Sequence, residues 1–182
     1  GTVVAEVVVS QSQGAVRKTD NDFDLAIDGK GFFVVDTPQG ERYTRNGSFL
    51  RSANGELVTS DGYKVMGTAG VITVDENAKF TVSPTGEIIV DDVPTDNLRL
   101  VDFAENVKLE KEGSTLFKAP NGATPTDSTA TIVQGSIEMS NVNVVGEMVK
   151  LITAYRAYET NAKAVQSHDA MLDKAVNEVG KV

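Results

Sequence analysis

The sequence contains no cysteine, no tryptophan and a single histidine, His168. The lack of cysteine excludes disulfide bonds, thiolate catalysis and cysteine-based zinc sites. There is also no apolar run of about 18 residues, so we expect no membrane insertion. The net charge of −9 argues against nucleic acid as the main partner.

The acidic charge is confined to one part of the chain. After residue 140, five basic side chains balance five acidic ones, so the whole net charge lies in the first 140 residues. This division predicts an acidic, solvated region followed by a neutral segment that is suited to packing.

The neutral segment has the pattern of one long amphipathic helix. Steps of four and three residues from Val144 land on apolar or aromatic side chains, with Asp169 as the exception. We call these positions the heptad seam: Val144, Met148, Leu151, Tyr155, Tyr158, Ala162, Val165, Asp169, Leu172, Val176 and Val179. Such a seam is typical of helices that wind around other helices. A helix over 142–179 would extend about 55 Å, which predicts that part of its surface lies on a partner.

A second apolar stripe, Val145, Val149 and Ile152, widens the apolar face near the start of this helix. Ser140 and Asn141 are the side chains that we expect to cap its N-terminus. The sequence therefore divides into a body over 1–139 and a helical region over 140–182.

The body has the pattern of an all-β domain. Short apolar runs alternate with Asn-Gly and Asp-Gly pairs, which are strong hairpin signals. We expect strands at 3–9, 25–27, 32–35, 42–44, 48–50, 57–58, 64–66, 71–74, 79–82, 87–90, 98–103, 107–109 and 132–139, with an exposed loop over 119–131. The predicted fold is mainly β, an irregular β-sandwich or barrel-like body, with a long C-terminal α-helix of coiled-coil type.

No group of residues has the pattern of an active site. Ser167, His168 and Asp169 are consecutive in a helix, so their side chains point about 100° apart and cannot form a relay. The segment 75–86 fails as a calcium loop because Phe80 stands where glycine is required. Asp91 and Asp92 are typical turn residues. We therefore expect no catalytic, cofactor or metal site and no small-molecule substrate.

Two further classes remain as alternatives. The first is an extracellular β-rich module that binds glycan or peptidoglycan and oligomerises through the helix. The second is a glycosidase with paired carboxylates.

Several blocks of the sequence resemble one protein family. They are residues 24–35 (Asp-Leu-Ala-Ile-Asp-Gly-Lys-Gly-Phe-Phe-Val-Val), 43–49, 54–59, 140–143, 147–149, 156–159 and 169–172. Together they resemble the axial proteins of the bacterial flagellum, the rod and hook proteins, and most closely the distal or proximal rod type. We take as the family motif Gly29, Gly31, Phe32, Phe33, Arg45, Gly47, Asn141, Asn143, Arg156 and Glu159.

The resemblance implies a structural subunit of the basal-body rod rather than an enzyme. It implies assembly with copies of itself and with other rod and hook subunits, and export through the flagellar type III apparatus to a position outside the cytoplasmic membrane. Members of the family also have an N-terminal helix with an Asn-rich segment, which this sequence lacks. We therefore expect the sequence to be a truncated piece of a longer protein.

Overall fold

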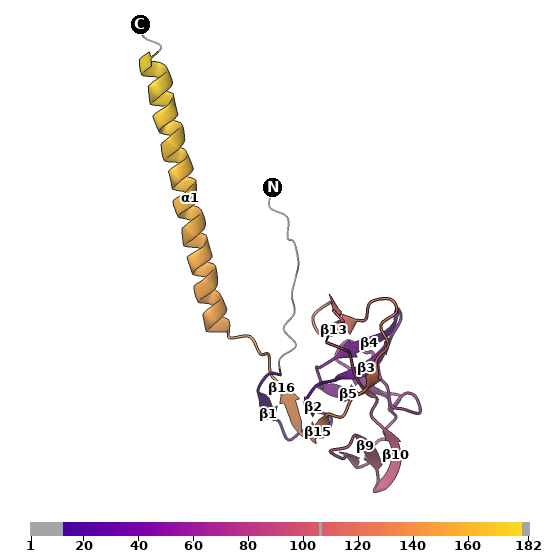
Figure 1. Ribbon diagram of the computed structural model, residues 1–182. Coiled ribbons are helices and arrows are strands. Elements are labelled where there is room, and N and C mark those ends of the chain that lie inside the picture. The colour runs from indigo at the N-terminus through magenta and orange to yellow at the C-terminus, as the bar shows by residue number, and fades with distance from the viewer. Residues whose placement is uncertain (1–12, 106, 180–182) are drawn as a thin grey trace. The chain divides into compact units, whose positions relative to one another are not determined.

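The computed structural model describes residues 13–105 and 107–179, and the chain separates into two compact units (Figure 1). The first ends at Asn141 and contains every described strand; the second begins at Val142 and contains the one described helix. The expected strand at 3–9 lies outside the described residues. None of the described helices is both long enough and apolar enough to cross a membrane.

The first unit, which we call the β body, is built around a nine-stranded sheet. Strands β3 (Phe32–Thr37) and β4 (Gly40–Thr44) form its central hairpin. Its other strands are β5 (Phe49–Arg51), β6 (Leu57–Thr59), β7 (Lys64–Val65), β11 (Leu100–Asp102), β12 (Glu110–Glu112), β13 (Leu116–Lys118) and β14 (Thr126–Asp127). The main path runs in the order β12-β13-β4-β3-β7-β6-β5, and β11 pairs with β3 and β14.

Three smaller sheets complete the β body. One contains β8 (Phe80–Val82), β9 (Glu87–Val90) and β10 (Val93–Asn97). A second pairs β2 (Leu25–Asp28) with β15 (Thr131–Gln134). The third is a ribbon of β1 (Val16–Lys18) and β16 (Ser136–Glu138), the last strand before the helix.

Strand β3 contributes to two hydrophobic cores. Side chains alternate between the two faces of a strand, so Phe33 and Val35 enter one core while Phe32 and Val34 enter the other. Phe33 packs edge-on against Phe49 with ring centroids 5.1 Å apart. The continuous apolar run over 32–35 therefore reflects a strand that is buried on both faces.

The predicted class, mainly β with a C-terminal helix, is confirmed, but the described strands do not close into a barrel because β12 and β5 end the main path without pairing. Two expected strands, 71–74 and 107–109, are wrong: the first makes only isolated bridges and the second is irregular. The expected strand over 132–139 is divided by Gly135, at φ 70°, into β15 and β16. Five observed strands, β1, β10, β12, β13 and β14, were not predicted, and all are short, polar or exposed.

The pair Asn46-Gly47 does not form a hairpin turn. Strand β4 pairs with β3 and β13, whereas β5 pairs with β6. Gly47 is needed for a different reason, since a Cβ atom there would collide with the carbonyl oxygen of Leu25. By contrast, Gly55, Gly62 and Gly86 have φ values of 80°, 84° and 88° and lie in the hairpins that the sequence predicts.

The second unit is the helix α1 (Val144–Val179). Its N-cap is Asn143, whose Oδ1 accepts a hydrogen bond of 3.0 Å from the backbone N–H of Gly146. The predicted cap at Ser140 and Asn141 was therefore two to three residues too early. At about 1.5 Å per residue, the 36 residues of α1 extend about 54 Å.

Candidate functional site

The heptad seam lies on the surface of α1. Leu151 and Tyr158 are 70% and 71% exposed, and Val144, Met148, Tyr155, Val165 and Leu172 are exposed to a similar degree. Ala162 is half-buried and Asp169 is exposed. Val176 and Val179 belong to α1, but their side chains lie outside the described residues.

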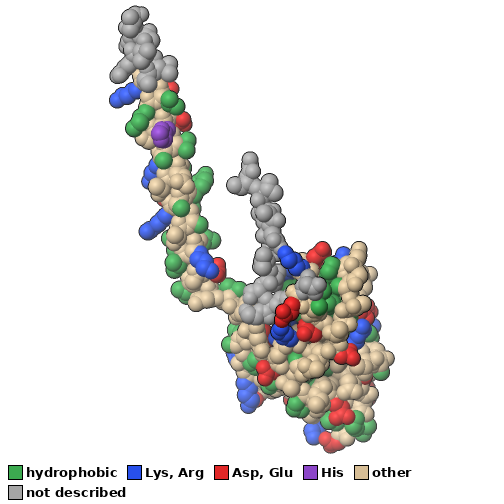
Figure 2. Space-filling model, viewed as in Figure 1, with side chains coloured by type: hydrophobic (Ala, Val, Ile, Leu, Met, Phe, Trp, Pro, Cys, Tyr) green, Lys and Arg blue, Asp and Glu red, His purple; other side chains and the backbone are tan. Residues whose placement is uncertain are grey.

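The second stripe is exposed as well. Val145, Val149 and Ile152 leave half or more of their surface in solvent, so the first four turns of α1 present a wide apolar face. Apolar side chains are visible along much of α1 in the space-filling view (Figure 2). Exposed apolar surface of this extent in one element typically marks a protein–protein contact.

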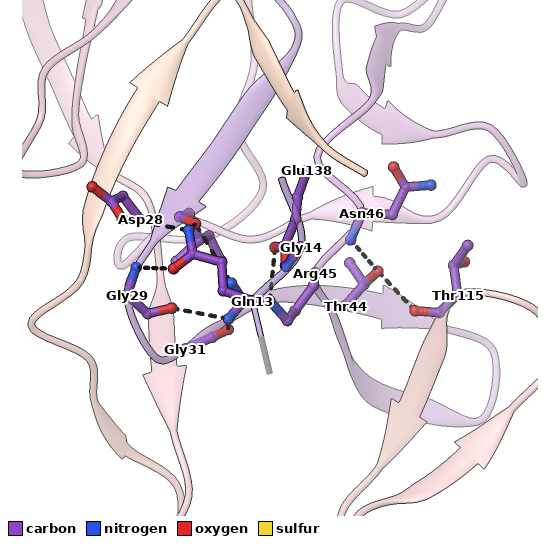
Figure 3. A network of polar contacts seen from close by, with 11 residues as sticks. Gln13, Gly14, Asp28, Gly29, Gly31, Thr44, Arg45, Asn46, Thr115 and Glu138 are labelled. Atoms are coloured by element: carbon purple, nitrogen blue, oxygen red, sulfur yellow. Dashed lines mark hydrogen bonds and ion pairs between the residues drawn. The ribbon is translucent and has the colours of Figure 1, made fainter. Parts of the chain in front are cut away.

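A second set of candidate residues surrounds Arg45 in the β body (Figure 3). The Arg45 Nε donates to Glu138 Oε2 at 2.8 Å, and Arg45 Nη1 donates to the carbonyl oxygens of Gly29 and Gly31 at 3.1 and 2.9 Å. The other carboxylate oxygen of Glu138 accepts a bond of 2.8 Å from the N–H of Gly14. The two charged side chains are only 16% and 9% exposed, so the ion pair is largely removed from water.

Gln13 extends this arrangement. Its amide nitrogen donates to the carbonyl of Ile27 at 3.1 Å, and its amide oxygen accepts from the N–H of Gly29 at 3.3 Å. We call the whole set the Arg45–Glu138 network: the side chains of Gln13, Arg45 and Glu138 with the backbone groups of Gly14, Gly29 and Gly31.

Two glycines allow the backbone conformation of the turn whose carbonyls bind Arg45. Gly29 and Gly31 have φ values of 117° and 151°, which side-chain-bearing residues rarely adopt. A Cβ atom on Gly31 would also lie 2.5 Å from the Ser128 Oγ. The two glycines of the family motif therefore form a turn whose carbonyls bind Arg45.

The structure brings together only part of the family motif. Gly29, Gly31 and Arg45 lie in one network, whereas Phe32 and Phe33 lie in the two separate cores. Asn143 caps α1, and Arg156 and Glu159 are exposed along it. Gly47 packs against Leu25, and Asn141 precedes α1 in the linker.

Glu138 and Gln13 were not identified from the sequence. They lie 93 and 32 positions from Arg45, so no local spacing connects them. One signal was available for Glu138: it is the only charged residue in the apolar run over 132–139. A charged side chain inside a strand pattern indicates a partner, because burial without one is costly.

Side chains with catalytic chemistry are not gathered into a site in the described part of the chain. Ser167, His168 and Asp169 are exposed positions of α1. Asp91 and Asp92, at φ 50° and 60°, form the turn between β9 and β10. Within residues 13–105 and 107–179, no three His, Cys, Asp or Glu side chains are grouped so that they could hold a metal ion.

Comparisons with known proteins identify both regions. A family model described as "Flagellar hook protein FlgE/F/G D1 domain" matches residues 26–90, and one described as "Flagellar basal body rod FlgEFG protein C-terminal" matches 133–178. The chain is 37% identical over 175 residues to the flagellar basal-body rod protein FlgG of Buchnera aphidicola subsp. Schizaphis graminum, with 90% of this chain and 67% of that protein covered. The chain belongs to the flagellar basal-body rod protein family.

Other rod proteins align over a similar extent. FlgG of Bacillus subtilis is 34% identical over 181 residues, which cover 91% of this chain and 69% of that protein. FlgF of Caulobacter vibrioides is 37% identical over 174 residues, with 94% and 71% covered. The Arg45–Glu138 network joins the segments that the two family models match separately.

Membership of the rod protein family decides between the classes that the sequence left open. The chain is a structural component of the flagellar basal body and not an enzyme, and it assembles with other axial subunits of the flagellum. The comparisons lend no support to a glycan-binding module.

Proposed function

We propose that the chain forms part of an axial tube in which the heptad seam of α1 packs against helices of neighbouring copies. The β body, proposed as the domain over 1–139, makes lateral contacts outside this core, and the region over 140–182 supplies the core helix. The observation that carries the proposal is the exposure of the seam, where large apolar side chains such as Leu151 and Tyr158 lie in solvent.

The period of the seam supports a coiled-coil contact. On a straight helix, positions that repeat every 3.5 residues rotate by about 20° per heptad, or about 100° over five heptads. A left-handed supercoil removes this rotation and keeps every seam residue directed at the partner. The sequence of α1 thus suits a helix that winds around others rather than one that lies alone.

The width of the apolar face suggests how many neighbours contact α1. Val145, Val149 and Ile152 lie roughly 100° around the helix from the seam, which is too far for one partner helix to cover both. We propose that the first four turns of α1 contact two neighbouring helices and the remainder contacts one.

Two edge strands of the β body are poorly suited to assembly by strand addition. Edge strand β12 consists of Glu110, Lys111 and Glu112, and charged edge strands resist pairing with another chain. Edge strand β10 contains Pro94, which has no N–H to donate, and its register shifts between Pro94 and Asp96. These features leave α1 as the better candidate for the main contact between subunits.

Charge reversal on the seam tests the proposal. Leu151→Glu would place a carboxylate in the apolar contact, so we expect cells with this substitution in the full-length protein to lack complete rods and to be non-motile. Ser167→Glu is the matched control, because it adds the same charge at an exposed position about 160° around α1 from Leu151 and beyond the four turns that carry the second stripe.

The measurements are motility and electron microscopy of basal bodies, with circular dichroism of the purified chain to verify that the β body is folded. Normal rods in the Leu151→Glu strain would show that the seam is not the assembly contact. Equal loss of rods in the Ser167→Glu strain would show that any added charge on α1 is harmful, which also contradicts a specific seam.

A further inference from the structure

The ribbon of β1 and β16 is held on the β body at two ends by different kinds of bond. At one end, the N–H groups of Gly135 and Ser136 donate to the carbonyl of Asp24 at 2.8 and 3.3 Å. At the other end, Met139 N–H donates to the carbonyl of Ala15 at 2.8 Å, which closes the ribbon itself. This second end, at Gly14 and Met139, is the end nearest in sequence to α1.

The contacts described between this second end and the rest of the β body run through side chains. Glu138 binds Arg45, and Gln13 binds the backbone of Ile27 and Gly29. Arg45 in turn binds the carbonyls of Gly29 and Gly31, so one guanidinium group connects the ribbon to the turn before β3. Figure 3 shows Glu138, Gly29 and Gly31 around Arg45, with Gln13 beside Gly29.

The close packing of Gly14 gives this end a defined geometry. A Cβ atom at Gly14 would collide with the carbonyl oxygen of Met139, so the two backbones touch. The same residue donates its N–H to Glu138. Glu138 is the last residue of β16, and its bond to Gly14 also holds the segment that leads into β1.

We propose that Arg45 and Glu138 are positioning residues, which fix the end of the β1–β16 ribbon and thereby set the direction in which the chain passes between the β body and the linker to α1. Five residues, 139–143, lie between β16 and α1, so the end of the ribbon that this pair fixes is also where the linker to α1 begins. The consequence for rod assembly rests on the proposed function, whereas the positioning is a property of the β body alone.

Burial explains why this pair holds the ribbon better than an ordinary surface contact. The Lys30–Glu105 ion pair also joins distant segments at 2.8 Å, but its side chains are 75% and 88% exposed. Exposed pairs contribute little because water and salt screen them, whereas removing one partner of a buried pair leaves an uncompensated charge. Glu105→Gln is thus a matched control for Glu138→Gln.

Hydrogen exchange of the full chain, resolved by residue, tests the proposal. In Glu138→Gln we expect the amides of Gly14 and Met139 to lose at least about tenfold in protection, because the local opening of this end becomes easier. The amides of Gly135 and Ser136 at the other end, and those of Phe33 and Val34 in β3, should keep their protection. Glu105→Gln should leave all of them unchanged.

A double-variant comparison separates positioning from a general loss of stability. If Arg45 and Glu138 act as one unit, Arg45→Met with Glu138→Gln should reduce protection at Met139 about as much as either single change does, and not by the product of the two. Multiplying effects, unchanged exchange at Gly14 and Met139, or an equal loss at Phe33 would each overturn the proposal.

The exchange result and the seam test are independent. Normal rods in the Leu151→Glu strain would refute the proposed function while leaving the exchange result in place. Normal protection at Met139 in Glu138→Gln would refute the positioning role while leaving the seam in place.

Discussion

The β body and α1 differ in the exposure of their apolar side chains. In the β body, Phe33, Phe49 and Val35 are completely buried, and the two cores contain most of its large apolar residues. In α1, apolar side chains of comparable size lie in solvent along the whole described length. The β body buries its own apolar surface, whereas the described residues leave most of the apolar surface of α1 in solvent.

This difference shows how one chain combines a stable unit with an assembling one. The charged edge strand β12 and the proline-containing edge strand β10 disfavour pairing with strands of another chain. The seam of α1 has only isolated interruptions such as Asp169. The parts of the molecule that resist association and the part that favours it are thus separated along the sequence.

Truncation of a core phenylalanine should have the largest effect. Phe33→Ala removes a fully buried ring that packs on Phe49, so we expect the β body to lose about 3–5 kcal/mol of unfolding free energy. Tyr158→Ala, which removes an equally large ring from α1, should leave β-body unfolding unchanged. Urea denaturation, monitored through the near-UV circular dichroism of the β-body tyrosines, measures this free energy. Similar losses of unfolding free energy in both variants would contradict the difference between the β body and α1.

Truncation on the seam should matter only after assembly. Leu172→Ala should destabilise the assembled rod by about 2–5 kcal/mol per subunit where the side chain is fully buried. In the unassembled chain the same change should alter helix stability by less than about 0.5 kcal/mol, because Leu172 is exposed and alanine is a good helix former. Thermal dissociation of isolated rods measures the effect on the assembled state, and helix melting of the free chain measures the effect on α1 alone. An equal loss of stability in both states would refute an intermolecular seam.

Removal of the helix cap should have a smaller effect, confined to α1. Asn143→Ala loses the bond to the Gly146 N–H and should destabilise the helix by about 1 kcal/mol. Asn143→Asp should retain most of this stability, since aspartate caps about as well as asparagine. Far-UV circular dichroism melts report the change, and equal losses in the two variants would show that the side chain does not act as a cap.

The smallest expected effect is a dependence of β-body stability on pH. Partial burial by itself raises the pKa of Asp96, but hydrogen bonds from Thr68, Asn97 and Ala69 outweigh it and leave the pKa below its usual value. A carboxyl whose pKa is lower in the folded than in the unfolded state stabilises the β body at pH values above its unfolded-state pKa. This stabilisation is lost as the pH falls through the folded-state pKa.

Asp96→Asn provides the comparison for this effect. Denaturation of both proteins at neutral and at acidic pH should show a stability difference in favour of Asp96 that shrinks on acidification. A difference that stays constant or grows as pH falls would show that Asp96 is not the group responsible.

Local patterns in the sequence predicted the features that depend on neighbouring residues. The apolar run over 32–35 identified the central strand, and the 3.5-residue period identified α1 almost to its ends. Strands such as β12 and β14 were missed because they consist of charged or small polar residues that are held by pairing rather than by burial.

Local sequence patterns could not predict contacts that depend on the tertiary structure. The sequence predicted the cap of α1 too early, at Ser140 and Asn141, because these residues cap helices about as well as Asn143 does. Only the structure shows that Asn143 is the residue that caps α1. Likewise, Asn46-Gly47 has the composition of a hairpin turn, yet the approach of Leu25 is what requires the glycine.

By itself, the sequence determined the two kinds of region, the strand over 32–35, the apolar seam and the resemblance to axial proteins, because hydrophobic periodicity acts over a few residues. The tertiary structure alone decided that Arg45 binds Glu138, that Gln13 binds the backbone of Ile27 and Gly29, and that Gly29 and Gly31 present their carbonyls to a cation. The reason is physical: a buried charge must be matched by whichever groups the fold brings within hydrogen-bonding distance, and those groups are distant in the chain.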